Sequence, residues 1–399
     1  MTDRRLGIIV NGATGGLAAG QHLRALLAIR AEGGLPVTNG DRVVPVPILV
    51  GRNAERLRAL AVASDVARWT TDLDLALSDP ADMVFFDAAA TGGRYPVLRR
   101  AIDAGKHIYC EKPIATTLQE ALDLVVAVQR AGRKGGTVQD KVFLPGFSRL
   151  RLLRDSGWFG RILEVRLESG RWVFDGTLQP PNRPSWNYRR RDGGGLVLDM
   201  FPHWRYMLDC LVGDIRAVSC TTRTHIPRRR DEAGLPYDVD VEDSVFAQMA
   251  LDGGAIASVN TSWCTRIRRD DVITLQVDGT KGSALATAHD CFTQPDVNTP
   301  AAVLTVDRRQ PMDFRAHWLP MPDAAAAATS YRMGWELFIR HVVDDAPFPS
   351  PLIAGAKGVQ LAELAHLSHR DRRWVDVPPL DPAVAAAAAA RDADAAIAR

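Results

Sequence analysis

The stretch LGIIVNGATGGL at residues 6–17 joins a short apolar run to a cluster of glycines. Residues 6–10 predict a buried strand, and an amphipathic pattern over residues 18–31 predicts a helix after it. Glycines between a strand and a helix permit a tight turn and let the backbone approach a diphosphate at the helix N-terminus. Because the spacing departs from the strict GxGxxG pattern, the stretch alone is consistent with a dinucleotide site or with a structural turn.

The same alternation of strand and helix continues to residue 130. The expected strands lie at 47–50, 83–86 and 107–110 and the expected helices at 53–62, 95–104 and 118–130, with residues 33–46 as a loop. Such alternation predicts βαβ units on a parallel sheet, which binds ligands beyond the carboxyl ends of its strands. We therefore expect residues 1–140 to form a doubly wound, Rossmann-type α/β domain that binds a dinucleotide.

The pattern changes near residue 141, where short β-branched runs separated by Asp-Gly and Gly-Gly turns replace the alternation. These runs predict antiparallel strands, accompanied by expected helices at 199–212, 332–343 and 354–370. We expect residues 141–380 to form an α+β domain with a large, mainly antiparallel open sheet. Residues 381–399 are expected to form an alanine-rich tail.

Composition limits the class of protein. The 399 residues suit two domains, and 46% hydrophobic with 24% charged residues is typical of a globular protein. Because 49 Lys and Arg nearly balance 47 Asp and Glu, nothing global attracts nucleic acid or an anionic membrane. No apolar run approaches the length of a membrane helix, and the start of the chain lacks a signal-peptide pattern. The five scattered cysteines favour a reducing cytoplasm over a disulfide framework or a zinc site.

The end of the second expected strand bears on cofactor choice. Rossmann domains that select NAD usually carry an acidic residue here, which accepts a hydrogen bond from the ribose 2′-hydroxyl. This chain has Arg52 followed by Asn53, and a guanidinium can pair bidentately with a 2′-phosphate. The sequence therefore favours NADP over NAD, with a solvent-exposed arginine at a helix start as the alternative.

Two distant segments carry side chains suited to acid–base chemistry. Lys112 follows the expected strand at 107–110, where its side chain would reach into the crevice of the sheet. Asp199 and His203 are four residues apart after three glycines, so they lie on one face of a helix start. A carboxylate near a histidine can fix its tautomer and raise its basicity. The spacing predicts catalytic functions for these three residues, with a solvated lysine and a core histidine as the alternatives.

The EKP tripeptide at 111–113 together with GGG…D…H at 193–203 resembles the Gfo/Idh/MocA family of NAD(P)-dependent oxidoreductases, the group of glucose–fructose oxidoreductase and inositol dehydrogenase. Later segments at 155–162, 253–255 and 278–282 resemble further parts of the family, so the likeness covers nearly the whole chain. It implies hydride transfer between a nicotinamide cofactor and a secondary hydroxyl or ketone of a sugar, glycoside or cyclic polyol. It also implies that the second domain binds the substrate and pairs its open sheet in a homodimer or homotetramer.

By the same resemblance, Lys112 and His203 face the reacting carbon with Asp199 supporting them. Oxidising an alcohol needs a base to take the proton and a donor to stabilise the alkoxide. His203 is the expected base and Lys112 the donor, although the two assignments can be exchanged. The expected cofactor contacts are Gly12, Thr14, Gly15, Gly16, Leu17, Arg52, Asn53, Thr91, Glu111 and Lys112.

The loop before the three glycines supplies the expected substrate contacts Trp186, Tyr188 and Arg189. Aromatic faces suit the C–H groups of a sugar ring, and arginines at 189–191 can bind an anionic group or remain solvated. The acidic residues between 238 and 243 lack a ligand-loop pattern, so we expect no metal site.

Two other functions would use the same residues. The first is glycoside cleavage or elimination through transient oxidation, which would proceed without net reduction of the cofactor. The second is a non-catalytic nucleotide-binding sensor, in which cofactor binding would be indifferent to Lys112→Ala. The presence of Lys112, Asp199 and His203 together favours an enzyme over the sensor.

Overall fold

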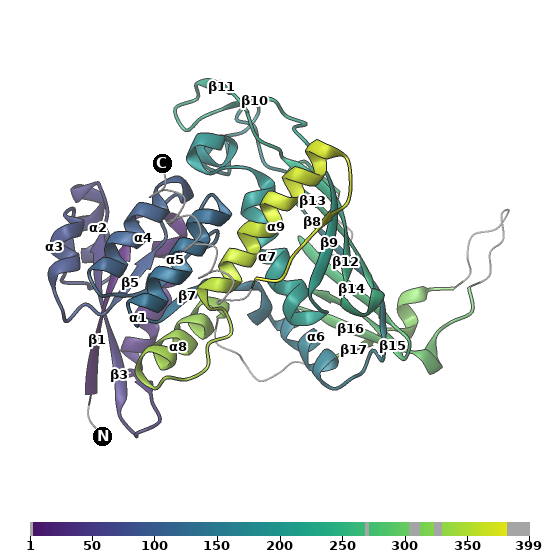
Figure 1. Cartoon of the computed structure of the whole chain (residues 1–399), viewed down its shortest axis with the longest axis horizontal. Helices are drawn as coiled ribbons and strands as arrows, with labels where there is room; N and C mark the ends of the chain where they lie inside the picture. The colour runs from purple at the N-terminus through teal and green to yellow at the C-terminus, as the bar shows by residue number, and fades with distance from the viewer. Residues whose placement is uncertain (1–2, 268–270, 303–311, 323–328, 381–399) are drawn as a thin grey trace, which may run out of the picture.

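The computed structural model describes residues 3–267, 271–302, 312–322 and 329–380. Figure 1 shows two lobes, each built on its own sheet, with helices α8 (Ser330–Val343) and α9 (Leu352–Asp371) between them. The predicted tail at 381–399 lies outside the described residues.

The first lobe contains a seven-stranded sheet that is parallel except for its short edge strand β2. Its strand order is β2-β3-β1-β5-β6-β7, with β4 also paired to β3. The strands are β1 (Asp3–Asn11), β2 (Leu35–Pro36), β3 (Arg42–Val50), β4 (Trp69–Thr70), β5 (Val84–Asp87), β6 (His107–Cys110) and β7 (Gly135–Thr137). This topology confirms the predicted Rossmann-type sheet.

Helices cover both faces of this sheet because successive strand residues point to opposite sides. Ile8 and Val10 join the hydrophobic cluster under one face, and Ile9 joins the cluster under the other. The covering helices are the π-helical turn η1 (Ala18–Leu23), α1 (Arg24–Ala31), α2 (Ala54–Ala63), α3 (Leu73–Ser78), α4 (Arg94–Asp103) and α5 (Leu118–Arg130).

The loop predicted at residues 33–46 is wrong, because β2 and the first half of β3 lie within it. Pro45 and Pro47 disguised the strand, since proline cannot donate to a sheet ladder. β3 pairs with β1 along its inner edge, while β2 and β4 pair only near its two ends. Both prolines fall between those ends, so their missing N–H groups break no ladder bond.

The second lobe contains a nine-stranded sheet in the order β17-β16-β15-β14-β8-β13-β12-β9-β18. All its pairings are antiparallel except that of β13 with β8, which confirms the mainly antiparallel prediction. The strands are β8 (Ile162–Gly170), β9 (Ile215–Arg223), β12 (Ser244–Leu251), β13 (Ile256–Ser262), β14 (Ile273–Gly279), β15 (Gly282–Thr287), β16 (Cys291–Pro295), β17 (Leu319–Pro320) and β18 (Val375–Asp376). A separate hairpin joins β10 (Arg228–Arg230) to β11 (Pro236–Asp238).

The two faces of the nine-stranded sheet differ. One face packs its apolar residues against α6 (Pro145–Asp155), α7 (Leu196–Leu211) and α9. The other face carries polar pairs, such as the ion pair of Arg166 with Glu164. It also exposes apolar side chains, among them Phe246, which is 47% exposed, and Ile256, which is 42% exposed. The open face therefore carries both polar pairs and exposed apolar side chains.

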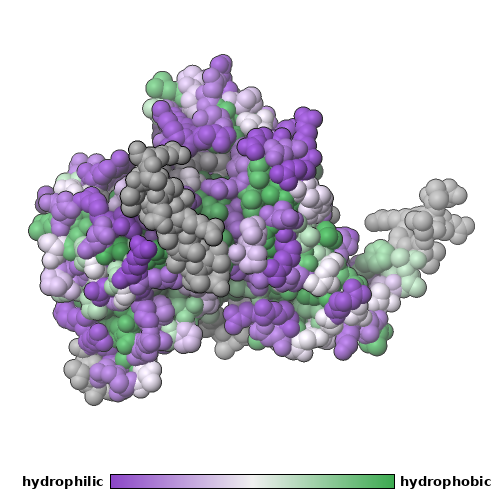
Figure 2. Space-filling model, viewed as in Figure 1, coloured by the Kyte–Doolittle hydropathy of each residue, from purple (hydrophilic) through white to green (hydrophobic). Residues whose placement is uncertain are grey.

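Helix α8 belongs to the second half of the chain but packs against the first lobe. Trp335, Phe338 and Ile339 lie in the same hydrophobic cluster as residues of β1, α1 and α2. The face of the molecule seen in Figure 2 is mostly hydrophilic with scattered apolar residues, since the larger apolar side chains are buried in these clusters. The domain limits at residues 140 and 380 remain a prediction.

Candidate active site

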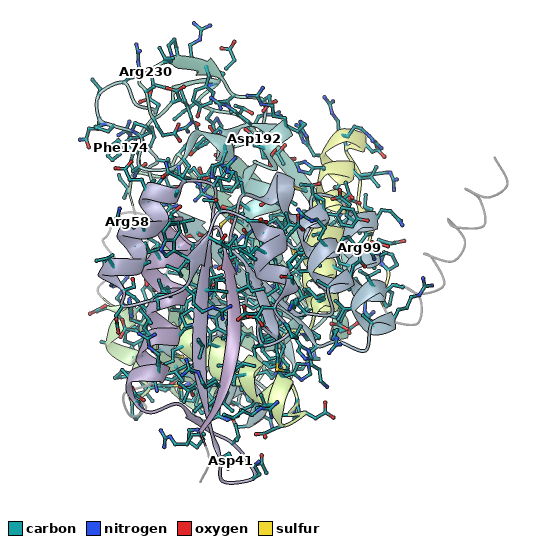
Figure 3. All side chains as sticks on the ribbon, turned by 90° about the vertical axis from the view of Figure 1, so that its left-hand side faces the viewer. Asp41, Arg58, Arg99, Phe174, Asp192 and Arg230 are labelled. Atoms are coloured by element: carbon teal, nitrogen blue, oxygen red, sulfur yellow. The ribbon has the colours of Figure 1, made fainter. Side chains whose placement is uncertain are left out.

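A cavity of about 1500 Å³ lies at the carboxyl ends of β1, β3, β5 and β6 and extends to α7 of the second lobe. In Figure 3, Asp41, the residue before β3, lies at the bottom, and Asp192 of the second lobe lies above the opposite ends of the strands. The cavity brings together every predicted catalytic and cofactor residue and one predicted substrate residue: Gly12, Thr14, Gly15, Gly16, Leu17, Arg52, Asn53, Thr91, Glu111, Lys112, Trp186, Asp199 and His203.

The glycine loop forms the floor of one end of the cavity. Gly12 has a φ of +71°, and a Cβ at this position would lie 2.8 Å from the backbone nitrogen of Ala89. The Gly15 N–H donates to the Gly12 carbonyl at 2.9 Å, which closes the turn before the helical residues begin. The loop therefore leaves backbone space that a larger residue would fill, as close approach to a diphosphate requires.

Two arginines stand beside this loop. Asn53 caps α2 by accepting a hydrogen bond from the Arg56 N–H at 2.9 Å, and Arg52 precedes it. The Arg56 guanidinium donates to the Thr14 carbonyl at 3.2 Å and lines the cavity together with Arg52. Sequence analysis missed Arg56, although its position one helical turn after Arg52 places both cations on the same side of the loop.

Lys112 and Asp199 meet across the two lobes. The Lys112 ammonium donates to the Asp199 carboxylate at 2.7 Å and to the Asp199 backbone carbonyl at 2.8 Å. Arg183 also donates to this carboxylate, from the loop before the three glycines. Burial alone would raise the pKa of Asp199, but the charges of Arg183 and Lys112 outweigh it and lower that pKa below its usual value.

His203 has different partners from those predicted. Its Nε2 lies 3.1 Å from the Lys141 ammonium, and its Nδ1 lies 3.8 Å from the Asp140 carboxylate. Burial, together with the positive charges of Lys141 and Lys112, lowers the pKa of His203 well below its usual value. The expected pairing of Asp199 with His203 is absent from the hydrogen bonds of the described residues, because Lys112 and Arg183 occupy the carboxylate.

Glu111 is held by a buried chain of hydrogen bonds. Its carboxylate lies 2.8 Å from His22 Nε2, and the Trp335 indole lies 3.1 Å from His22 Nδ1. An indole N–H can only donate, so Nδ1 is the acceptor and Nε2 donates to Glu111. Neither His22 nor Trp335 was predicted to belong to the site. Each lies within a helical segment without a recognisable motif, and more than 300 residues separate them in the sequence.

Arg94 fixes the backbone around this chain of groups. It is buried, forms a 2.7 Å ion pair with Asp87 and donates to the carbonyls of Ala89 and Pro113. One side chain thus connects the end of β5 with the segments that carry Thr91 and Lys112. The Lys112–Pro113 peptide bond is cis.

Two predicted substrate contacts lie away from the cavity. Tyr188 is only 1% exposed, packs against Trp263 and has the Arg229 guanidinium 4.0 Å above its ring. Arg189 stacks over Tyr237 at 4.7 Å. The loop turns Trp186 toward the cavity instead, and it brings in Arg183, which sequence analysis did not single out.

The acidic residues near β12 have structural partners. Glu242 accepts a hydrogen bond from the Val197 N–H at 2.8 Å and so caps α7, which carries Asp199 and His203. Asp243 accepts from the N–H groups of His225 and Ile226, both at 2.9 Å. Across the described part of the chain, no group of three or more His, Cys, Asp or Glu side chains is arranged to hold a metal ion.

Comparison with known proteins places this geometry in a family. A model of the oxidoreductase family with an NAD-binding Rossmann fold matches residues 7–138, and a model of the GFO/IDH/MocA C-terminal domain matches residues 147–285. The chain is 43% identical over 378 residues to a D-xylose dehydrogenase from Paenarthrobacter nicotinovorans, covering 94% of this chain and 97% of that protein. The chain belongs to the Gfo/Idh/MocA family of oxidoreductases.

Other Gfo/Idh/MocA relatives agree with this assignment. A 1,5-anhydro-D-fructose reductase from Ensifer adhaerens is 30% identical over 277 residues, covering 68% of this chain and 73% of the relative. A levoglucosan dehydrogenase solved in complex with NADH and levoglucosan superposes with a TM-score of 0.77 at 23% identity, covering 94% of this chain and all of that one. This likeness confirms the fold of both lobes.

The remaining sequence predictions concern cysteines and membranes. The five cysteines are all free in the structure. Among the residues that the structure describes, no helix combines the length and the apolar character needed to cross a membrane.

Proposed function

We propose that this Gfo/Idh/MocA protein transfers a hydride between a nicotinamide cofactor and a secondary hydroxyl or ketone of a sugar or related polyol. The observation that carries the proposal is the contact of Lys112 from the first lobe with Asp199 from the second, in the cavity that also holds the glycine loop. The relatives named above support the substrate class, since their names all refer to sugars or sugar derivatives.

The residues of the first lobe fit a dinucleotide. The left-handed Gly12 leaves room for a diphosphate, and Thr91 and Glu111 line the same cavity farther along. When bound there, the nicotinamide accepts or returns the hydride. The cofactor contacts proposed are those predicted from the sequence, with Arg56 added.

Lys112 acts as the hydrogen-bond donor to the substrate oxygen. A lysine ammonium has three N–H donors, and two of them are used on Asp199. The third is left for the substrate oxygen, whose developing negative charge the ammonium stabilises. Asp199, which Arg183 holds by a second ion pair, keeps Lys112 in position and so supports Lys112 rather than His203.

His203 acts as the base in the oxidation direction. It lines the cavity and its depressed pKa keeps the ring neutral, as a proton acceptor must be. Lys112, paired with a carboxylate, is the weaker candidate for this task. Trp186 offers an apolar face to the substrate ring.

The cofactor preference proposed is NADP over NAD. Arg52 and Arg56 stand beside the glycine loop, and no acidic side chain lines the cavity between them and that loop among the described residues. Two guanidinium groups suit a 2′-phosphate, whereas an NAD site would need a carboxylate for the ribose 2′-hydroxyl.

We also propose a homodimer or homotetramer formed through the open face of the nine-stranded sheet, and a cytoplasmic location. Phe246 and Ile256 are exposed on that face, and the free cysteines suit a reducing compartment. Sedimentation of the purified protein tests the assembly: a concentration-independent monomer would contradict it.

The experiment that tests the function measures the absorbance of the reduced cofactor with a panel of aldoses, glycosides and cyclitols, using NAD and NADP in parallel. The expected result is cofactor reduction with at least one sugar and a lower KM for NADP. Turnover of a glycoside without net cofactor reduction would instead indicate cleavage through transient oxidation. Cofactor binding with no turnover of any compound would indicate a sensor.

A further inference from the structure

Lys141 contacts the proposed base directly. It lies at the start of the 3₁₀ turn Lys141–Phe143, just after β7, and its ammonium is 3.1 Å from His203 Nε2. Both side chains line the cavity, with 16% of the Lys141 side chain and 5% of the His203 side chain exposed. The contact therefore lies inside the site rather than at the surface.

The hydrogen-bonding capacities of the Lys141 ammonium and the His203 imidazole determine which ring nitrogen carries the hydrogen. A lysine ammonium donates and never accepts, and a neutral imidazole has one donor and one acceptor nitrogen. With Nε2 accepting from Lys141, the ring hydrogen of His203 lies on Nδ1. Protonating Nε2 as well would set two N–H donors and two positive charges against each other at this distance.

The groups around His203 oppose its protonation on balance. Lys141 and Lys112 add positive charge, while Asp140 lies 3.8 Å from Nδ1 and 3.6 Å from the Lys141 ammonium. Asp199 on the same helix is paired with Lys112 and Arg183, and Tyr331 of α8 lines the cavity on the Asp140 side. Nδ1 is buried and has no hydrogen-bond partner among the described residues, so an imidazolium would gain only the charge of Asp140 at 3.8 Å and no hydrogen bond at Nδ1.

We propose that Lys141 is a positioning residue that holds His203 neutral, with its hydrogen on Nδ1 and its lone pair on Nε2. The inference rests on the proposed function, in which His203 is the base. In the oxidation direction the substrate hydroxyl replaces Lys141 at Nε2 and gives its proton to that nitrogen. Lys141 therefore extends the activity to pH values at which an ordinary histidine is protonated.

The first test is the pH profile of kcat/KM for sugar oxidation. Removing the positive neighbour in Lys141→Met raises the pKa of His203, so the acidic limb moves to higher pH by about one unit. Lys141→Arg keeps the charge, and its limb stays at the wild-type position. Asp140→Asn removes a negative neighbour, so its limb moves to lower pH. Lys281→Met, at an exposed position outside the cavity, is the matched control.

The second test reads His203 without cofactor or substrate. Nitrogen-15 labelling of the nine histidines, with His203→Asn to assign the signal, reports the tautomer and the titration midpoint of the ring. We expect the Nδ1–H form in the wild type, and a higher midpoint in Lys141→Met but not in Lys141→Arg.

The outcomes separate this inference from the proposed function. An unchanged limb and midpoint in Lys141→Met, or an equal shift in Lys281→Met, would overturn the action of Lys141 while leaving sugar oxidation intact. If the wild type oxidised no sugar, the proposed function would fail, and the ring titration would still decide whether Lys141 sets the state of His203. If Lys141→Met does not fold, Asp140→Asn provides the opposite shift.

Discussion

The two ends of the cavity are built in different ways. The cofactor end, made by the glycine loop with Arg52 and Arg56, offers backbone groups and exposed side chains. The substrate end, made by Lys112, Lys141, Arg183, Asp199 and His203, buries charged groups against one another. A large anionic ligand is bound by shape and charge, whereas a reacting oxygen needs groups whose protonation is fixed in advance. Substitutions at the substrate end are therefore expected to change kcat, and those at the cofactor end to change binding.

The largest expected effect is that of Lys112→Met at the substrate end. Removing the donor to the substrate oxygen lowers kcat by about 10³-fold, within the range of general acid–base catalysis. Asp199 keeps Arg183 as a partner, so the melting temperature changes little. Cofactor affinity, measured by quenching of tryptophan fluorescence, should fall by about tenfold at most, or about 1.4 kcal/mol, because Lys112 is only one of several proposed cofactor contacts. A larger loss of cofactor affinity would contradict the expectation that substitutions at the substrate end mainly change kcat.

The next effect is that of Gly12→Ala at the cofactor end. A side chain at φ +71° that meets the Ala89 backbone at 2.8 Å displaces the loop at a cost of about 1–3 kcal/mol, which weakens cofactor binding by about fivefold to 150-fold. Gly20→Ala is the matched control, because its Cβ would meet no atom within 4 Å and Gly20 does not line the cavity. Titration calorimetry compares the two variants, and equal losses would show that the close approach of the loop is unimportant.

A smaller effect is expected for the double variant Arg52→Ser, Arg56→Ser. Losing charge-assisted hydrogen bonds at an exposed position reduces the preference for NADP over NAD by about tenfold. Arg58→Ser on the same helix, outside the cavity, should leave the ratio of kcat/KM for the two cofactors unchanged. A preference that survives the double variant would place the selectivity elsewhere.

The smallest effect is expected at the junction of the two ends, for Trp335→Phe. The change removes the donor to His22 Nδ1 and leaves a cavity where the larger indole packed in the core, so the free energy of unfolding falls by about 2–3 kcal/mol. Glu111 then loses its fixed partner, and kcat/KM for the cofactor falls by about fivefold. Denaturant unfolding and steady-state kinetics measure the two changes, with Trp374→Phe at an exposed position as the control. A loss comparable to that of Lys112→Met would mean that α8 takes part in the chemistry.

The same contrast explains what could be predicted from the sequence. The cofactor end comes from nearly contiguous segments whose periodicity is local, and β6 and α5 have the predicted bounds His107–Cys110 and Leu118–Arg130. Lys112 and His203 could be singled out because each stands in a short motif. Lys141 and Arg183 stand in none, and only the docking of the lobes shows that they reach the same cavity. A position just after β7, at the carboxyl edge of the sheet, was the available signal for Lys141.

Helical spacing was a poor guide to pairing. Asp199 and His203 share a helix face as predicted, yet the carboxylate binds Lys112 and Arg183, which come from other segments. Two strong cations compete better for a carboxylate than a neutral imidazole does. Tyr188 was predicted to contact the substrate because it is an aromatic residue in a polar loop. In the structure its ring is buried and packs against the Arg229 guanidinium instead.

Helix α8 bears on the order in which the protein can acquire its native form. Trp335 and Phe338 fill a core whose other members come almost entirely from the first third of the sequence. During synthesis, the hydrophobic core of the first lobe therefore stays incomplete until the segment after residue 330, which forms α8, leaves the ribosome. A fragment that ends near residue 140 would lack Trp335 and Phe338. A fusion protein that contains only this half would therefore have an incomplete hydrophobic core.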